Sequence, residues 1–291
     1  MQTFNWKAYL ENYPDLQLAG INTREKALRH YKRTGQKEQR SDQPGITTNT
    51  LLNLGGRFGN ILFYTFVADY ISRKNDILIT YNEIEKIKSL GIDLHEGTKR
   101  YEHTLVLTDE NVDNIFSIFE NPLMDKNLII GGYFQTPTVA RYIKETIHKE
   151  SIIEKNPYKN RYPCYTGNND VFIHIRLGDI LDFNAQEEYI YYEQTLSKIT
   201  FDRGFISSDS PDHIYCKNLI EKFNLYPFQA DEINTIQFAS TCKSIVLSKG
   251  TFSWFIGVLA FYSEIFFPDK IGMKPWHGDI FVFPEWNKVT Y

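Results

Sequence analysis

The chain has 291 residues, and with 42% hydrophobic residues it can bury a large core and form two domains of ordinary size. Its net charge of −4 gives no overall basic field, which argues against nucleic acid as the main partner. The first residues lack the apolar core of a signal peptide, and no run is long and apolar enough to span a bilayer. We therefore expect no transmembrane segment and a cytoplasmic location.

The three cysteines are widely spaced and include no CxxC pair. Cys164, Cys216 and Cys242 thus predict neither a disulfide framework nor a structural zinc site. We expect reduced thiols.

Residues 1–40 predict a small helical hairpin that forms an accessory module. Aromatic and apolar residues repeat at helical spacing from Trp6 to Tyr13, and Pro14 ends that helix. Asn22 or Thr23 would cap a second helix that ends near Gly35. The polar segment 41–45, with Pro and Gly, is an expected linker.

An apolar stretch from Leu51, a glycine turn at 55–60 and a helix over 61–71 follow the linker. In this order of strand, loop and helix, backbone N–H groups at the helix start can bind an anion. The GxGxxG spacing of a dinucleotide site is absent. A tight turn that needs glycine for its backbone angles is the alternative interpretation.

The middle of the chain is less informative. Segments 77–79 and 128–130 predict buried strands, and 138–150 predicts a helix. The turn-rich segment 155–170 is the expected boundary between an N-terminal half, 46–165, and a C-terminal half, 166–291.

The segment Val171–Asp179 predicts a buried strand that runs into a turn. Side chains alternate along a strand, so His174 and Arg176 project from the same face. A buried guanidinium needs an anionic partner. That partner is either an internal carboxylate or a phosphate of a bound nucleotide, and His174 is equally well a core histidine.

Strand and helix patterns alternate through the rest of the chain. Predicted strands are 205–209, 244–248 and 265–267, and predicted helices are 212–223, 232–240 and 251–262. This alternation indicates a parallel sheet covered on both faces, with ligands beyond the carboxyl ends of its strands. One rim would then carry Arg176, Asp179, Ser208, Asp209, Gly250, Thr251 and Ser253.

Five motifs in the same order resemble the alpha-1,2-fucosyltransferase family and, more distantly, the core and protein-O-fucosyltransferases. The resemblance extends over most of residues 50–291. The motifs are Gly55–Phe63, His174–Asp179 with Tyr191-Tyr192, Ser207–Asp209, Cys242-Lys243 with Thr251–Phe255, and Asp279–Trp286.

The resemblance implies an α/β fold of the GT-B type, with two Rossmann-like halves and the GDP-sugar donor held by the C-terminal half. It also implies an inverting, metal-independent transfer, most directly of L-fucose from GDP-fucose to a glycan hydroxyl. No cofactor is implied beyond the donor substrate. The absence of an Asp-x-Asp pair agrees with a reaction that uses no metal.

Roles for single residues follow from the resemblance and from charge. A fixed guanidinium at Arg176 would stabilise the departing diphosphate with two parallel N–H donors. The expected catalytic residues are Arg176, Asp179 and Asn60. The donor-binding residues are His174, Arg176, Asp209, Lys249, Gly250, Thr251, Phe252 and Ser253, and the acceptor side has Gly56, Arg57, Gly59 and Asn60.

Alternatives remain at several positions. Thr251 is also a candidate helix N-cap, and Arg57 a surface charge. Asp182, Glu187 and Glu188 are further candidate bases beside Asp179, although a dissociative displacement would need no strong base.

Departures from the motif weaken the assignment of fucose. Leu177 replaces the second Arg of the motif and removes a positive charge, which Lys249 could restore. Donor choice could also have moved to another nucleotide sugar. A catalytically silent glycan-binding or scaffold protein is therefore a competing hypothesis, and a dinucleotide-dependent oxidoreductase is disfavoured.

Overall fold

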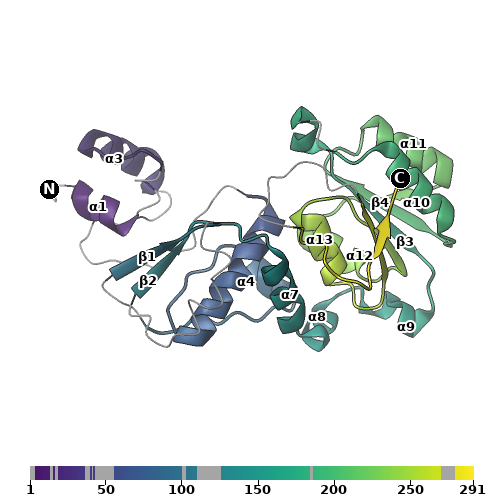
Figure 1. Ribbon diagram of the computed structural model, residues 1–291, viewed down its shortest axis with the longest axis horizontal. Coiled ribbons are helices and arrows are strands. Elements are labelled where there is room, and N and C mark those ends of the chain that lie inside the picture. The colour runs from purple at the N-terminus through teal and green to yellow at the C-terminus, as the bar shows by residue number, and fades with distance from the viewer. Residues whose placement is uncertain are drawn as a thin grey trace. The chain divides into compact units, whose positions relative to one another are not determined.

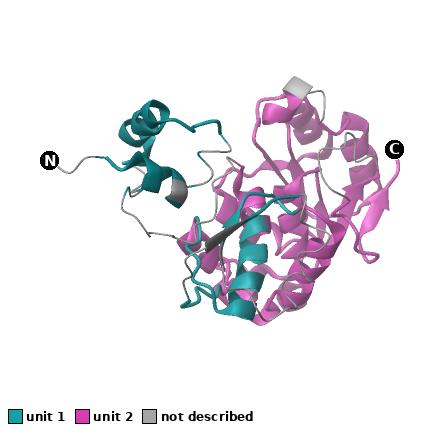
Figure 2. Ribbon diagram, turned by 60° about the vertical axis from the view of Figure 1, so that its left-hand side comes forward, with its two compact units in different colours: residues 1–55, 64–82, 94–134 teal, residues 56–63, 83–93, 135–291 magenta. Residues whose placement is uncertain are grey.

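The computed structural model describes residues 4–13, 16, 19–36, 40, 42, 56–99, 103–109, 126–183, 186–269 and 279–291. Figure 1 labels the elements of the chain, which divides into two compact units (Figure 2). Unit 1 comprises 1–55, 64–82 and 94–134, and unit 2 comprises 56–63, 83–93 and 135–291. Helix α4 (Phe58–Asn75) contributes residues to both.

Unit 2 contains a six-stranded sheet in which every adjacent pair is parallel. The strand order is β5-β4-β3-β6-β7-β8, which is the doubly wound order that many nucleotide-binding domains share. The strands are β3 (Val171–Ile175), β4 (Gly204–Ser208), β5 (Tyr226–Pro227), β6 (Ser244–Val246), β7 (Glu264–Pro268) and β8 (Asn287–Val289).

Strand β3 is the central strand. All five of its residues are buried, and it pairs with β4 on one side and β6 on the other. β-Branched and aromatic residues suit a strand that is covered on both faces. The chain leaves β3 toward β4 and later returns to β6 beside it, so the strand order reverses between β3 and β6.

Helices cover both faces of β3. Val171, Ile173 and Ile175 pack in one core cluster with side chains of α10 (Tyr189–Lys198) and α11 (Ile214–Phe223). On the opposite face, the ring of Phe172 lies 6.2 Å from that of Phe238 in α12 (Glu232–Ala239). His174 on this face contacts α13 (Thr251–Val258).

Shorter helices complete unit 2. They are α5 (Ile84–Ser89), α7 (Pro137–Thr146), α8 (Lys149–Lys155), α9 (Pro163–Thr166), and the 3-10 helices η3 (Lys159–Arg161) and η4 (Gly178–Phe183). Helix α7 begins where Thr136 caps the amide of Val139 and proline occupies the first turn.

The described part of unit 1 holds a two-stranded parallel sheet and the N-terminal helices. Strands β1 (His103–Leu107) and β2 (Lys126–Ile130) pair with His103 opposite Lys126. The predicted N-terminal helices form as α1 (Trp6–Asn12) and α3 (Arg24–His30), and Thr23 is the cap of α3. A π-helix, η1 (Tyr31–Gly35), continues directly from α3.

The protein is thus α/β with mostly parallel strands, as the sequence predicts. None of the described helices is both long and apolar enough to cross a membrane. The predicted strand at 77–79 forms only a bridge from Ile77 to Lys99. The apolar stretch 51–54 and most of the linker 41–45 lie outside the described residues.

The compact units do not follow the predicted halves, because residues 135–165 pack with the C-terminal residues. The amide Nδ2 of Asn156 donates to the carbonyl of Gln237 at 2.8 Å. The ring of Tyr158 lies 5.4 Å from that of Phe238. The division into halves 46–165 and 166–291, and the two-domain architecture it implies, stay predictions.

Candidate functional site

Polar residues gather in unit 2 where the chain leaves three neighbouring strands. Arg176 follows β3, Asp209 follows β4, and the segment 247–250 joins β6 to α13. This is the carboxyl edge of the sheet, at the point between β3 and β6 where the strand order reverses. Open parallel sheets bind ligands in the crevice at this point.

Two arginines and two aspartates form an ion-pair network at this edge. Arg57 Nη1 lies 2.5 Å from Asp209 Oδ2, and Arg57 Nη2 lies 2.9 Å from Asp179 Oδ1. Arg176 Nη2 contacts the same Asp179 carboxylate at 3.3 Å. Asp179 is about half exposed, so this carboxylate is open to solvent and can be displaced.

Asp209 is the firmly held member of the network. Its Oδ1 accepts hydrogen bonds from the amides of Leu177 at 2.8 Å and Gly178 at 3.0 Å. Burial would raise the pKa of Asp209, but the Arg57 guanidinium and these two amides outweigh burial and lower it. A Cβ at Gly178 would lie 2.6 Å from Asp209 Oδ2, so a larger residue there would have to displace this carboxylate.

Arg176 is held in place but is not fully satisfied. Its Nε is buried and has no hydrogen-bond partner among the described residues. Gly250 has φ +100°, and a Cβ there would lie 2.9 Å from Arg176 Nη1. The backbone of the β6–α13 turn therefore approaches the guanidinium as only glycine allows.

The other end of β3 shows what a structural arginine–aspartate cluster looks like in this fold. Asp170 is 2% exposed and receives Arg161 Nη2 at 2.9 Å, Arg203 Nε at 3.0 Å and Arg203 Nη2 at 2.7 Å. Its carboxylate is buried and saturated. Arg176 instead shares the half-exposed carboxylate of Asp179 with Arg57, at a distance of 3.3 Å. A guanidinium held this loosely can bind another anion.

His174 supplies no positive charge at neutral pH. Burial lowers the pKa of His174 to about 4, an effect that nearby Asp209 only partly offsets. Its Nδ1 lies 2.5 Å from Ser253 Oγ, which also accepts a hydrogen bond from the amide of Ser248 at 3.1 Å. The neutral imidazole therefore fixes the first turn of α13 against β3.

Asn60 lies against the same helix start. Its Oδ1 accepts hydrogen bonds from Thr251 Oγ1 at 2.7 Å and from Gln135 Nε2 at 3.0 Å. A Cβ at Gly59 would lie 2.7 Å from the carbonyl carbon of Thr251. Gly250, not Thr251, is the N-cap of α13, so the alternative interpretation of Thr251 as a cap is wrong.

Lys249 is paired inside the protein rather than open to a ligand. It is buried, and its Nζ lies 3.2 Å from Glu187 Oε1. Tyr291 donates to Glu187 Oε2 at 2.7 Å. Burial raises the pKa of Glu187, although Tyr291 and Lys249 act in the opposite direction. Leu177 is fully buried in the core cluster. Because Lys249 is paired with Glu187, it does not replace the positive charge that is lost at Leu177.

The structure thus brings together most residues that the sequence singles out. Arg57 and Asn60, expected on the acceptor side, contact Asp209, Asp179 and Thr251. Gln135 was not expected here; the only signal was its place after the Gly131-Gly132 turn. The side chain of Asp182 lies outside the described part of the chain.

Comparison with protein-family models and with curated proteins gives no match to this chain.

Proposed function

We propose that unit 2 holds the nucleotide-sugar site of an inverting, metal-independent glycosyltransferase. The donor is GDP-fucose or a related GDP-deoxysugar, and the acceptor is a glycan hydroxyl. The observation that carries the proposal is the guanidinium of Arg176 at the reversal of strand order, where its Nη2 makes only a long, 3.3 Å contact to the half-exposed carboxylate of Asp179. A guanidinium whose described anionic partner is exposed and displaceable suits a diphosphate at this position.

The geometry supports a role in departure of the leaving group. Charge grows on the β-phosphate as the bond from the sugar to the nucleotide breaks, and positioned cationic donors stabilise that charge. Arg176 and Arg57 supply two guanidiniums, and the first amides of α13 lie beside Gly250 with no acceptor inside the helix. Asp179 would release both arginines when the diphosphate binds. Its carboxylate could then take up the proton of the acceptor's hydroxyl group.

Calorimetric titration tests the proposal directly. The full chain would be titrated with GDP, GDP-fucose, UDP-glucose and UDP-N-acetylglucosamine. Binding of GDP and GDP-fucose, with weaker binding of both UDP-sugars, is expected. Indifference to every nucleotide would overturn the proposal.

The buried Lys249–Glu187 pair favours a second candidate function. With Lys249 paired to Glu187 and Leu177 in the core, the site offers fewer free cations than the motif resemblance implies. A catalytically silent glycan-binding protein with the same fold would tolerate that loss. Hydrolysis of GDP-fucose, or transfer from it to any sugar acceptor, would exclude this alternative.

A further inference from the structure

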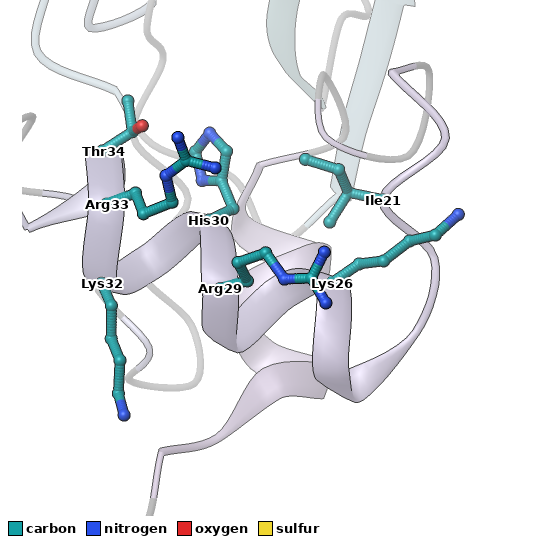
Figure 3. A pocket seen from close by; sticks show the side chains of 7 residues that line it. All are labelled: Ile21, Lys26, Arg29, His30, Lys32, Arg33 and Thr34. Carbon is teal, nitrogen blue, oxygen red and sulfur yellow. The ribbon is translucent and has the colours of Figure 1, made fainter.

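The N-terminal module contains a hollow of about 740 Å³, which we call the basic pocket (Figure 3). It is formed within a short segment that includes α3 and η1. The residues that line it are Ile21, Lys26, Arg29, His30, Lys32, Arg33 and Thr34.

The pocket concentrates positive charge on a chain whose net charge is −4. Glu25 is the only acidic residue in the described segment 19–36, and it is not part of the lining. Among the residues that the structure describes, no carboxylate pairs with Arg29, Lys32 or Arg33. Arg29 and Arg33 are four residues apart, a spacing at which like charges destabilise a helix unless an anion lies between them.

The backbone beneath these cations is held in a defined geometry. Tyr9 is fully buried, and its hydroxyl lies 2.9 Å from His30 Nδ1. A side chain at Gly35 would collide with the Tyr9 hydroxyl, so the close fit of η1 requires glycine. π-Helical turns cost stability and are found frequently at functional sites. The Lys26 ammonium is fixed by the carbonyl of Gly20 at 2.8 Å.

The lining indicates the chemistry of the ligand. Among the described lining residues, Ile21 is the only large apolar side chain and none is Phe, Tyr or Trp, so His30 is the only ring there on which a nucleic acid base could stack. Guanidinium groups match phosphate oxygens with two parallel hydrogen bonds. We propose that the basic pocket binds a ligand that carries two or more phosphate groups, independently of the site in unit 2.

Binding of inorganic tripolyphosphate to the full chain tests this proposal. The double variant Arg29→Ala/Arg33→Ala should bind at least about tenfold more weakly, since hydrogen bonds to charged groups contribute strongly to affinity. Arg24→Ala is the matched control, because Arg24 lies exposed on the same helix outside the pocket. Equal loss in the control, or no binding at all, would overturn the proposal.

Tripolyphosphate could also enter the site at Arg176, so the titration is repeated with Arg176→Ala. Binding that survives Arg176→Ala but not the double variant belongs to the basic pocket. Nuclear magnetic resonance gives a local signal, because the His30 ring resonances should shift on titration. Binding that Arg176→Ala abolishes and the double variant leaves intact would overturn the proposal.

The phosphate groups could come from a soluble molecule or from a lipid headgroup. Sedimentation with phosphatidylcholine vesicles, with and without phosphatidylinositol 4,5-bisphosphate, separates these sources. Vesicle binding that requires the phosphoinositide and is lost in the double variant identifies a headgroup, and tripolyphosphate binding alone identifies a soluble ligand. A preference for single-stranded oligonucleotide over both would contradict the proposal.

Discussion

At the scale of single residues, Arg176 is the position on which the proposed function depends most. Arg176→Ala removes a donor that strengthens as the diphosphate leaves, so turnover should fall by roughly two to three orders of magnitude. Steady-state transfer from GDP-fucose measures this effect. Lys198→Ala, an exposed change on α10, should leave turnover unaltered. Full activity in Arg176→Ala would show that the residue is structural.

Asp179 competes with the diphosphate for both arginines. Asp179→Asn removes the negative charge that lies 2.9 Å from Arg57 and 3.3 Å from Arg176. GDP should therefore bind more tightly, by up to about fivefold, because exposed ion pairs contribute about 0.2–1 kcal/mol. If the Asp179 carboxylate also takes up the proton of the acceptor's hydroxyl group, sugar transfer should become slower in this variant. Calorimetry and turnover on the same preparation separate the two effects, and weaker GDP binding would refute the competition.

His174 should make stability depend on pH. Burial lowers its pKa to about 4 in the folded protein, against 6.5 for the ordinary side chain. Between these values the unfolded chain binds the extra proton, so stability falls as pH drops from 6.5 toward 4, by about 3 kcal/mol in total. Urea unfolding at pH 7.5 and 4.5 measures the loss. His174→Gln should show a smaller difference between the two pH values, and an equal difference would assign the loss to other groups.

At the scale of elements, the contact between the start of α4 and the start of α13 positions Asn60. Gly59→Ala would place a methyl group 2.7 Å from the Thr251 carbonyl carbon, and backbone cannot yield as a side chain does. We expect a loss of about 1–3 kcal/mol in the free energy of unfolding, as for other overpacked sites. Chemical denaturation measures it. Lys217→Ala, an exposed change on α11, should stay within about 0.5 kcal/mol of the parent.

The elements that the sequence predicts well are those in which local pattern and burial agree. Strand β3 is apolar throughout and central, and α12 has both a capping Asp231 and an apolar face, so each can be found within its own residues. Strands β5 and β8 were missed because they are short, partly exposed and defined by their neighbours. Such strands form because they pair with a neighbouring strand, and the local sequence carries no signal for that pairing.

The site was predictable where residues follow predicted strands, and not where partners come from far along the chain. The turn positions of Arg176, Asp209 and Gly250 follow from the rule for parallel sheets. The pairing of Arg57 with Asp209 joins residues 152 positions apart, and no spacing rule encodes it. The sequence also does not predict the buried pair of Lys249 and Glu187. The two residues are far apart along the chain, and both residue types are ordinarily exposed.

At the scale of the whole molecule, the two sites proposed among the described residues differ in construction. The site in unit 2 balances two arginines with two aspartates, whereas the basic pocket has no paired carboxylate among the described residues. If the proposed function holds, a ligand of the unit 2 site would have to displace Asp179 from both arginines, so simple anions should bind weakly there. An unbalanced pocket attracts anions by charge and should weaken markedly as salt is raised.

The two sites should therefore respond separately to GDP in hydrogen exchange of the full chain. At 100 times its dissociation constant, GDP stabilises the form that it binds by about 2.7 kcal/mol. Amides near Arg176 and in the turn at Lys249–Ser253 should exchange up to about 100-fold more slowly, since their opening releases the nucleotide. Amides of α3 and η1 should gain much less protection, because the basic pocket can hold only the diphosphate of GDP and offers little surface to its base. Protection confined to α3 and η1 would instead move nucleotide binding to the basic pocket and leave Arg176 with a structural role.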